Sequence, residues 1–268
     1  MDFFHDIHEI RDSFYKFAKL LPEDGVLIIN GDIPHFEEIT KDLTCRVVTY
    51  GFDASFDYSA SDITYDSHAR GTFTLTRKNG STARFSLGVT GEHNVSNALA
   101  AIALADLLSI PEETTQKALS AFSGTDRRFE YKGTVAGVTI IDDYAHHPTE
   151  IEATLKAAEN YPHKNLWCVF QPHTYTRTKA FLTDFAKALS LADKVVLADI
   201  YAAREKDTLG ISSQTLQEEI QKLGTECYYF PSFDEIENFL LENCINDDLL
   251  ITMGAGDIVK IGESLLGN

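Results

Sequence analysis

The chain has 268 residues, a formal net charge of −18 at pH 7, and 44% hydrophobic and 24% charged residues. This length is enough for one large domain or two modest ones with a real core. The acidic balance excludes a general binder of nucleic acid or of anionic membranes, because such a protein needs a basic face. It leaves room for a local phosphate pocket, since the charge of a whole chain says little about one cleft.

Cysteine usage and hydropathy indicate the compartment. The four cysteines, Cys45, Cys168, Cys227 and Cys244, are scattered and form no CxxC pair, which favours small core residues in a reducing compartment. No stretch approaches the ~20 apolar residues of a membrane span. The N-terminus has neither the basic region nor the apolar core of a signal peptide. We therefore expect a cytoplasmic protein.

The chain opens on a helix and then alternates strands with helices. The residues before Gly25 predict an amphipathic helix with an apolar side that runs from Ile10 to Leu21 and includes Phe14, Phe17 and Leu20. Short strands are expected at 25–30 and 46–52, with a helix near 34–42 between them. A parallel sheet normally begins with central strands and a ligand-binding loop, and neither precedes this helix. We expect a domain that the chain enters partway through.

From residue 61 the pattern changes to antiparallel strands. Asn79-Gly80 separates two alternating runs between 61 and 90, and this dipeptide is typical of a two-residue hairpin turn. Helices are expected at 91–110 and 112–122, followed by a linker at 123–133. We place a domain boundary there, with one domain at 1–125 and another at 126–268.

The rest of the chain predicts a doubly wound, Rossmann-like α/β domain. Strands are expected at 134–142, 166–171, 194–200, 226–230 and 248–253, and helices at 148–159, 177–190, 212–223, 233–243 and 257–266. Strands alternating with helices of this length indicate a parallel sheet, whose ligands bind at the carboxyl ends of the strands. Four of these ends carry polar clusters, DDYAHHP, QPHTYTRT, DIYAAREKD and GAGD, and together they predict the rim of a pocket.

The stretch DDYAHHPTE, residues 142–150, allows several interpretations. Adjacent histidines on an extended segment point in opposite directions and no HxxxH spacing occurs, so His146 and His147 do not predict a zinc site. Helix capping by Asp142 or Thr149 explains part of the acidic content and the proline. It does not explain why Tyr144 stands beside two histidines.

Other polar residues also have two interpretations. Near His173, Arg177 suits a carboxylate or phosphate, or simply starts a solvated helix. The glycines of 254–258 suit an anion-binding nest or a tight turn. Asn94 and Asn97 lie three residues apart on one helix face, where two amides could read the edge of a base, or Asn94 could cap the helix.

Taken together, GEHNVSNALAA, GTDRRFE, DDYAHHPTEI, FQPHTYTRT and DIYAAREKD resemble the motifs of the Mur ligases of peptidoglycan synthesis, in order and over essentially the whole chain. Mur ligases have a UDP-sugar-binding domain, a central ATPase domain and a C-terminal Rossmann-like domain. The resemblance implies that 1–125 is the later part of the central domain and 126–268 the C-terminal domain. It also implies that the P-loop lysine and the main Mg²⁺ ligands lie upstream, so the 268 residues alone are expected to be inactive.

The resemblance further implies an ATP- and Mg²⁺-dependent ligation, through an acyl phosphate, of L-alanine to the carboxylate of UDP-N-acetylmuramate. Nucleotide contacts are implied at Asn94, Asn97, Arg128 and Asp143. Contacts with the amino acid and the muramoyl carboxylate are implied at Tyr144, His147, His173 and Arg177. Catalytic roles are implied for Arg128, His147 and Arg177, and no metal ligand is expected in this chain.

Three alternatives remain open. A murein peptide ligase would attach a tripeptide to the same sugar nucleotide, although the motif forms favour the alanine-adding activity. A non-catalytic fragment would bind a nucleotide or a partner without turnover. A metal-dependent hydrolase would use His146 and His147. The sequence indicates no oligomeric state.

Overall fold

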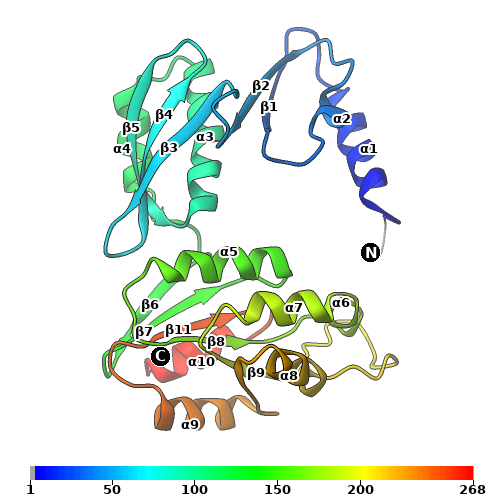
Figure 1. The fold of residues 1–268 in the computed structure, drawn as a ribbon, viewed down its shortest axis with the longest axis vertical. Coiled ribbons are helices and arrows are strands. Elements are labelled where there is room, and N and C mark those ends of the chain that lie inside the picture. The colour runs from blue at the N-terminus through cyan, green and yellow to red at the C-terminus, as the bar shows by residue number, and fades with distance from the viewer. Residues whose placement is uncertain (1–3, 268) are drawn as a thin grey trace. The chain divides into compact units, whose positions relative to one another are not determined.

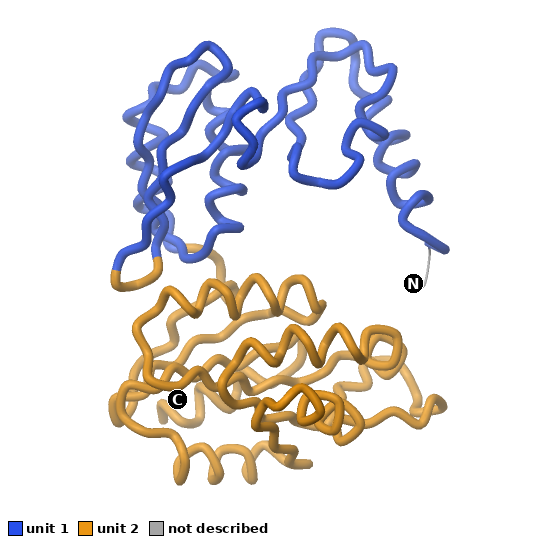
Figure 2. The backbone as a smooth tube through the Cα atoms, in the orientation of Figure 1, with its two compact units in different colours: residues 1–66, 70–123 blue, residues 67–69, 124–268 orange. Residues whose placement is uncertain are grey.

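The computed structural model describes residues 4–267, which fall into two compact units (Figure 2). The first unit includes the residues up to 66 and 70–123, and the second includes 67–69 and the residues from 124 onward. The first three residues of the expected opening helix, and Asn268, lie outside the described residues. Among residues 4–267 no helix is long and apolar enough to cross a bilayer.

The first unit is built on one mixed sheet with the strand order β1-β2-β3-β4-β5 (Figure 1). β1 pairs with β2 and β2 with β3 in parallel, whereas β3, β4 and β5 are antiparallel. This confirms the expected α/β fold with an antiparallel segment. The elements are α1 (Ile7–Ala18), β1 (Val26–Asn30), α2 (Glu37–Thr40), β2 (Arg46–Gly51), β3 (Tyr58–Tyr65), β4 (Arg70–Arg77), β5 (Thr82–Thr90), α3 (Glu92–Leu107) and α4 (Glu112–Ala121).

The opening helix α1 forms, but the side that packs is not its apolar side. Phe14, Phe17 and Leu20 are 57%, 71% and 77% exposed. The packed side instead buries Ala18 and brings Arg11 to the carbonyl of Pro34, next to α2. The spacing of apolar residues thus predicted the helix and failed to predict which side of it is covered within the described chain.

Two hairpins differ from the sequence-based expectation. The loop after β4 has three residues, 78–80, and of these only Gly80 has a positive φ, so the two-residue turn expected at Asn79-Gly80 was wrong. Conversely, the expected linker and the strand at 134–142 form a hairpin of β6 (Glu130–Val135) and β7 (Val138–Asp143). Its two-residue turn places both Ala136 and Gly137 at positive φ. Alanine rarely adopts that conformation, which is why the turn was missed.

The second unit is the expected doubly wound domain. Its sheet has the order β10-β9-β8-β11-β7-β6, in which only β6 is antiparallel to its neighbour. The further elements are α5 (Pro148–Glu159), β8 (Leu166–Phe170), α6 (Tyr175–Ala180), α7 (Leu182–Leu189), β9 (Lys194–Leu197), α8 (Ser213–Lys222), β10 (Glu226–Tyr229), α9 (Phe233–Asn243), β11 (Leu249–Met253) and α10 (Val259–Leu265). The helix expected at 177–190 is broken at Phe181, where α6 ends and α7 begins.

Helices cover both faces of this sheet (Figure 1). One apolar cluster joins α5, α7 and α8 to the strands through residues such as Ile151, Phe185 and Leu216. A second cluster joins α9 and α10 to the opposite face through Ile236 and Ile261. β8 and β11 are buried along their whole length because both faces are covered, as buried parallel strands require.

A buried carboxylate closes the end of this sheet that lies away from the polar loops. Asp248 is 2% exposed and accepts hydrogen bonds from Trp167 Nε1 (2.9 Å), Asn165 Nδ2 (2.7 Å) and Ile245 N (3.1 Å). Removing it would leave three donors without their acceptor, and one of them, the Trp167 indole N–H, is fully buried. A buried donor left unpaired costs ~1–3 kcal/mol, and such costs are not additive.

We therefore expect Asp248→Ala to lower the free energy of unfolding of the second unit by about 3 kcal/mol. Trp167 is the single tryptophan of the chain, and its fluorescence during urea unfolding reports on this unit. Asp257→Ala is the control, because that carboxylate is exposed and its ion pair with Lys260 should contribute less than ~0.5 kcal/mol. Equal losses for the two variants would contradict the proposed role of Asp248.

Candidate functional site

The carboxyl ends of four parallel strands lie side by side at one edge of the second sheet. Met253 at the end of β11 pairs with Asp143 of β7 on one side and with Phe170 of β8 on the other. Phe170 in turn pairs with Leu197 at the end of β9. The four polar loops expected to form a rim therefore leave the sheet from adjacent positions.

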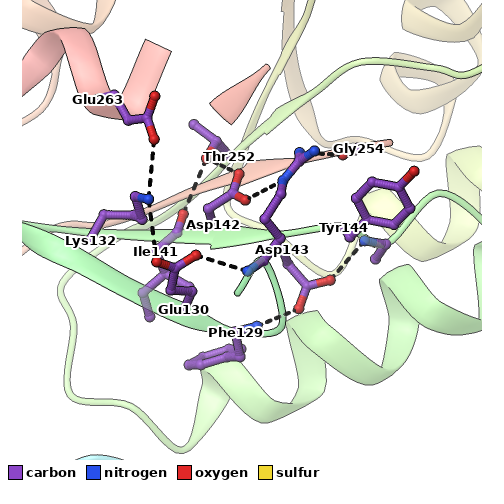
Figure 3. Close-up of polar contacts among 12 residues, drawn as sticks. Phe129, Glu130, Lys132, Ile141, Asp142, Asp143, Tyr144, Thr252, Gly254 and Glu263 are labelled. Atoms are coloured by element: carbon purple, nitrogen blue, oxygen red, sulfur yellow. Dashed lines mark hydrogen bonds and ion pairs between the residues drawn. The ribbon is translucent and has the colours of Figure 1, made fainter. Parts of the chain in front are cut away.

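Arg127 organises the β7 end of this edge, where Asp142, Thr252 and Gly254 come together in Figure 3. Asp142 is fully buried, and its carboxylate accepts hydrogen bonds from Arg127 Nε (2.9 Å) and Thr252 Oγ1 (2.7 Å). Arg127 Nη2 also donates to the carbonyl of Gly254 at 2.8 Å. Burial raises the pKa of Asp142, and the guanidinium opposes that shift. One arginine thus joins β7, β11 and the loop that follows β11.

Asp143 holds the backbone around it. Its Oδ1 accepts from Ala145 N and its Oδ2 from Phe129 N, both at 2.8 Å, and the residue is 5% exposed (Figure 3). Burial raises its pKa. The Thr154 side chain also forms a hydrogen bond with this carboxylate. The two oxygens offer about four lone-pair sites, so a ribose contact is compatible with this geometry, and the nucleotide role of Asp143 stays a proposal.

Aromatic rings gather above this edge. The ring of Tyr144 lies under the guanidinium groups of Arg127 (4.9 Å) and Arg128 (5.8 Å), distances at which a cation is attracted to a π face. Tyr144 meets His146 edge-on at 5.4 Å, and His146 meets His173 at 6.0 Å. The structure therefore brings the expected residues Arg128, Tyr144 and His173 into one group, together with His146.

His147 has a structural role at the start of α5. It is the N-cap, its Nδ1 accepts from Thr149 N at 3.3 Å, and its own N–H donates to Glu150 Oε2. The capping expected from Asp142 or Thr149 was therefore wrong. The ring packs edge-on against Phe181 at 4.9 Å, away from the partners of His146.

A groove between α5 and α7 lies beside this ring. It has a volume of about 580 Å³, and His147, Phe181 and Lys187 are among its lining residues. That volume is within the range of pockets that hold small molecules. The substrate role expected for His147 remains a proposal, and its imidazole would act there through Nε2, because Nδ1 is used by the cap.

Unpaired polar atoms collect after β8. His173 Nδ1 and Arg177 Nη1 are buried, and neither has a hydrogen-bond partner among residues 4–267. The imidazole of His173 stacks on Tyr201 at 5.6 Å. Burial lowers the pKa of His173, and the charge of Arg177 lowers it further, so both factors favour the uncharged imidazole. An uncharged imidazole beside a guanidinium with an unpaired N–H suits a carboxylate ligand better than a cationic ligand.

Asn94 and Asn97 lie on α3 in the first unit. Asn94 Nδ2 donates to the carbonyl of Thr90 at 2.8 Å, and Asn97 Nδ2 donates to Asn94 Oδ1 at 3.1 Å. The N-cap of α3 is Gly91, so capping by Asn94 was wrong. The two amides are thus linked by a hydrogen bond, and the exposed Asn97 keeps its oxygen available for a ligand.

Metal ligation has little support in the described chain. Residues 4–267 contain no group of three histidine, cysteine, aspartate or glutamate side chains placed to hold an ion. The backbone N–H of Gly254, the first in the 254–258 loop, is not free to bind an anion, because it donates to the carbonyl of Asp143 at 3.0 Å. That leaves the tight-turn interpretation of this loop as the better-supported one.

Sequence reasoning missed two residues of this edge. Arg127 was seen only as half of an arginine pair, and its partners Asp142 and Gly254 are 15 and 127 residues away in sequence. Gln171, which follows β8, carries a third unpaired buried atom, Oε1. A glutamine before a proline reads as an ordinary loop residue, and no spacing rule identifies it.

Two family models match the chain. The Mur ligase middle domain matches residues 1–105, and the "Mur ligase, glutamate ligase domain" matches residues 127–256.

Curated relatives extend the similarity over nearly the whole chain. The UDP-N-acetylmuramate–L-alanine ligase of Agathobacter rectalis is 57% identical over 266 residues, which are 99% of this chain and 58% of the relative. The ligase of the same name from Lachnospira eligens is 58% identical over 267 residues, with the same coverage. The chain therefore spans less than two thirds of the length of these relatives.

Solved structures share the fold. The UDP-N-acetylmuramate-alanine ligase MurC of Thermotoga maritima has a TM-score of 0.73 at 27% identity, over 94% of this chain and 61% of that one. A murein peptide ligase of Psychrobacter arcticus has a TM-score of 0.66 at 27% identity, over 98% of this chain and 55% of that one. Structural similarity alone does not separate the two activities, whereas the sequence relatives carry the alanine ligase name.

Proposed function

This chain belongs to the Mur ligase family, and we propose that it is part of an enzyme that joins L-alanine to the carboxylate of UDP-N-acetylmuramate in peptidoglycan synthesis. The observation that carries the proposal is that Arg177 Nη1 and His173 Nδ1 are both buried without a hydrogen-bond partner among residues 4–267. Arg177 would hold the carboxylate of the incoming amino acid in a bidentate pair. Since the substrates include ATP and a nucleotide sugar, we place this reaction in the cytoplasm.

The chemistry needs activation, because a carboxylate does not condense with an amine in water. ATP, when bound, supplies the phosphoryl group that converts the muramoyl carboxylate into an acyl phosphate. Arg128 is exposed and held near the Tyr144 ring, so its charge can move to meet developing phosphate charge. Tyr144 and His147 would line the path of the substrate, and Arg177 would orient the amine through the carboxylate it holds.

The proposed nucleotide contacts also rest on the hydrogen-bonding groups that these residues offer. The linked amides of Asn94 and Asn97 offer a donor and an acceptor to the edge of a base. Asp143 retains lone pairs for ribose hydroxyls although backbone amides occupy both of its oxygens. No step is assigned to Mg²⁺ on this chain, because the described residues offer it no ligand cluster.

We also propose that the 268 residues alone do not turn over ATP, because they contain no GxxGK[ST]-type loop to cradle phosphates. The test joins the segment of the Agathobacter rectalis ligase that precedes the matching region to this chain. Phosphate release is measured with ATP, Mg²⁺, UDP-N-acetylmuramate and either L-alanine or a tripeptide, with the unjoined chain in parallel.

The fusion is expected to release phosphate with L-alanine, and the unjoined chain is expected to release none. Turnover with the tripeptide alone would identify a murein peptide ligase instead. Turnover by the unjoined chain would show that its inactivity was wrongly inferred.

A further inference from the structure

Gln171 is held rigidly, with one of its two polar atoms unused. It follows β8, is 7% exposed, and its backbone N–H donates to the carbonyl of Met253 at 3.0 Å. Its side-chain Nε2 donates to the carbonyl of Asp199 at 3.4 Å. Its Oε1 is buried and has no partner among residues 4–267. A buried amide oxygen without a donor is energetically unfavourable, so it calls for a functional explanation.

The loop after β11 is pressed against this amide. A Cβ atom on Gly256 would lie 2.3 Å from Gln171 Oε1 and 3.2 Å from Cγ of Tyr201. A Cβ on Gly254 would lie 2.8 Å from the backbone oxygen of Gln171. Gly254 needs to be glycine because the backbone of Gln171 approaches it so closely, and glycine at 256 lets the loop lie directly against the amide oxygen of Gln171.

Three unpaired atoms lie within seven residues of one another in sequence, and the same aromatic ring borders two of them. They are Gln171 Oε1, His173 Nδ1 and Arg177 Nη1. Tyr201 stacks on the imidazole of His173 and also reaches Gly256, which adjoins the oxygen of Gln171. The group offers an acceptor, a neutral imidazole and a cationic donor. A small molecule that carries an N–H donor next to a carboxylate complements this group.

We propose that Gln171 Oε1 accepts a hydrogen bond from the amino group of the incoming amino acid, while Arg177 holds its carboxylate. This inference rests on the proposed function and adds to it the residue that recognises the nucleophile. A carboxylate at position 171 would pair with Arg177 and would hold the amino group as an ammonium ion. A neutral amide accepts an N–H from the ammonium and from the free amine alike, so it does not oppose loss of the proton before attack.

The test separates the amine contact from general damage to the pocket. In the fusion enzyme, KM is measured for L-alanine, and Ki is measured for propionate, which has the carboxylate and the methyl group but no amine. Gln171→Met keeps the length of the side chain and removes the acceptor. It is expected to raise KM for L-alanine by about 10- to 100-fold and to leave Ki for propionate within about twofold.

Two further variants complete the design. Gly256→Ala drives a methyl group into the amide of Gln171, so it is expected to raise KM for L-alanine in the same selective way without altering Gln171. Gln217→Met is the control. Gln217 lies on α8, is partly buried, and donates its Nε2 to a backbone carbonyl, that of Cys227, as Gln171 does to that of Asp199. Its kinetics should match the parent enzyme. Trp167 fluorescence shows that each variant is folded.

The outcomes are distinct. An unchanged KM for L-alanine in Gln171→Met, or equal rises in KM and in Ki for propionate, would overturn the role of Gln171 while the proposed function stands. A parent fusion that does not use L-alanine would overturn the proposed function, and this inference with it.

Discussion

Replacing Arg127 with leucine is expected to lower the free energy of unfolding of the second unit by about 3–5 kcal/mol. The carboxylate of Asp142 is fully buried, and Arg127 Nε is its nearest cationic partner at 2.9 Å. Without the guanidinium, a charge would remain in the interior with only Thr252 Oγ1 as a donor from a side chain. The carbonyl of Gly254 would lose its donor as well.

The loss of unfolding free energy in Arg127→Leu should depend on pH, and the burial of Asp142 determines whether the loss grows or shrinks as the pH rises. Burial already raises the pKa of Asp142 in the folded protein, and removing Arg127 would raise it further. The folded variant would then hold a proton that the unfolded chain releases, so its stability falls as pH rises. Urea unfolding followed by Trp167 fluorescence at pH 5 and pH 8 should show the larger deficit at pH 8.

Two variants test the assignment of this loss to the buried pair. Arg128→Leu removes the neighbouring arginine, which is exposed and contacts the ring of Tyr144, and should change stability by less than ~0.5 kcal/mol. Adding Asp142→Asn to Arg127→Leu removes the uncompensated charge and should recover much of the loss. A similar deficit for both arginines, or no recovery in the double variant, would be inconsistent with this account.

Local patterns predicted most of the second unit, because its central strands are short buried runs bounded by turns. β8 and β11 are uniformly apolar, and the helices between the strands have ordinary lengths. α1 shows the limit of this reasoning. The spacing of Phe14 and Phe17 defines an apolar side, yet which side is covered depends on a partner element, and local spacing contains no information about that.

The site was predictable in position and less so in its contacts. Parallel strands bring their carboxyl ends to one edge whatever their side chains, so the rim of His173, Arg177 and Tyr144 could be expected from strand ends alone. The contacts of Arg127 and Gln171 depend on how β7, β8 and β11 pair, and on glycines that allow the last loop to approach. Such register and close packing involve residues far apart in sequence, which motif spacing does not describe.

Replacing Arg177 with alanine is expected to raise KM for L-alanine in the fusion enzyme by on the order of 10²-fold. Truncating one partner of a buried charge pair costs ~2–5 kcal/mol, and each 1.4 kcal/mol is tenfold in affinity. Arg177 Nη1 is buried without a partner in the described chain, so a ligand carboxylate would be its main acceptor. KM for UDP-N-acetylmuramate should change less, because Arg177 is proposed to hold the amino acid and not the sugar nucleotide.

Two variants distinguish a bidentate pair from a simple need for positive charge. Arg177→Lys keeps the charge and loses the planar pair of donors, so it should recover only part of the affinity for L-alanine. Lys179→Ala removes a cation from the same short helix, where its Nζ donates to the carbonyl of Leu209, and should leave KM close to that of the parent. If Arg177→Ala and Lys179→Ala raised KM equally and Arg177→Lys matched the parent, the pocket would be sensing net charge. Arg177 would then not hold the amino-acid carboxylate, because only a direct contact makes the geometry of the donors matter.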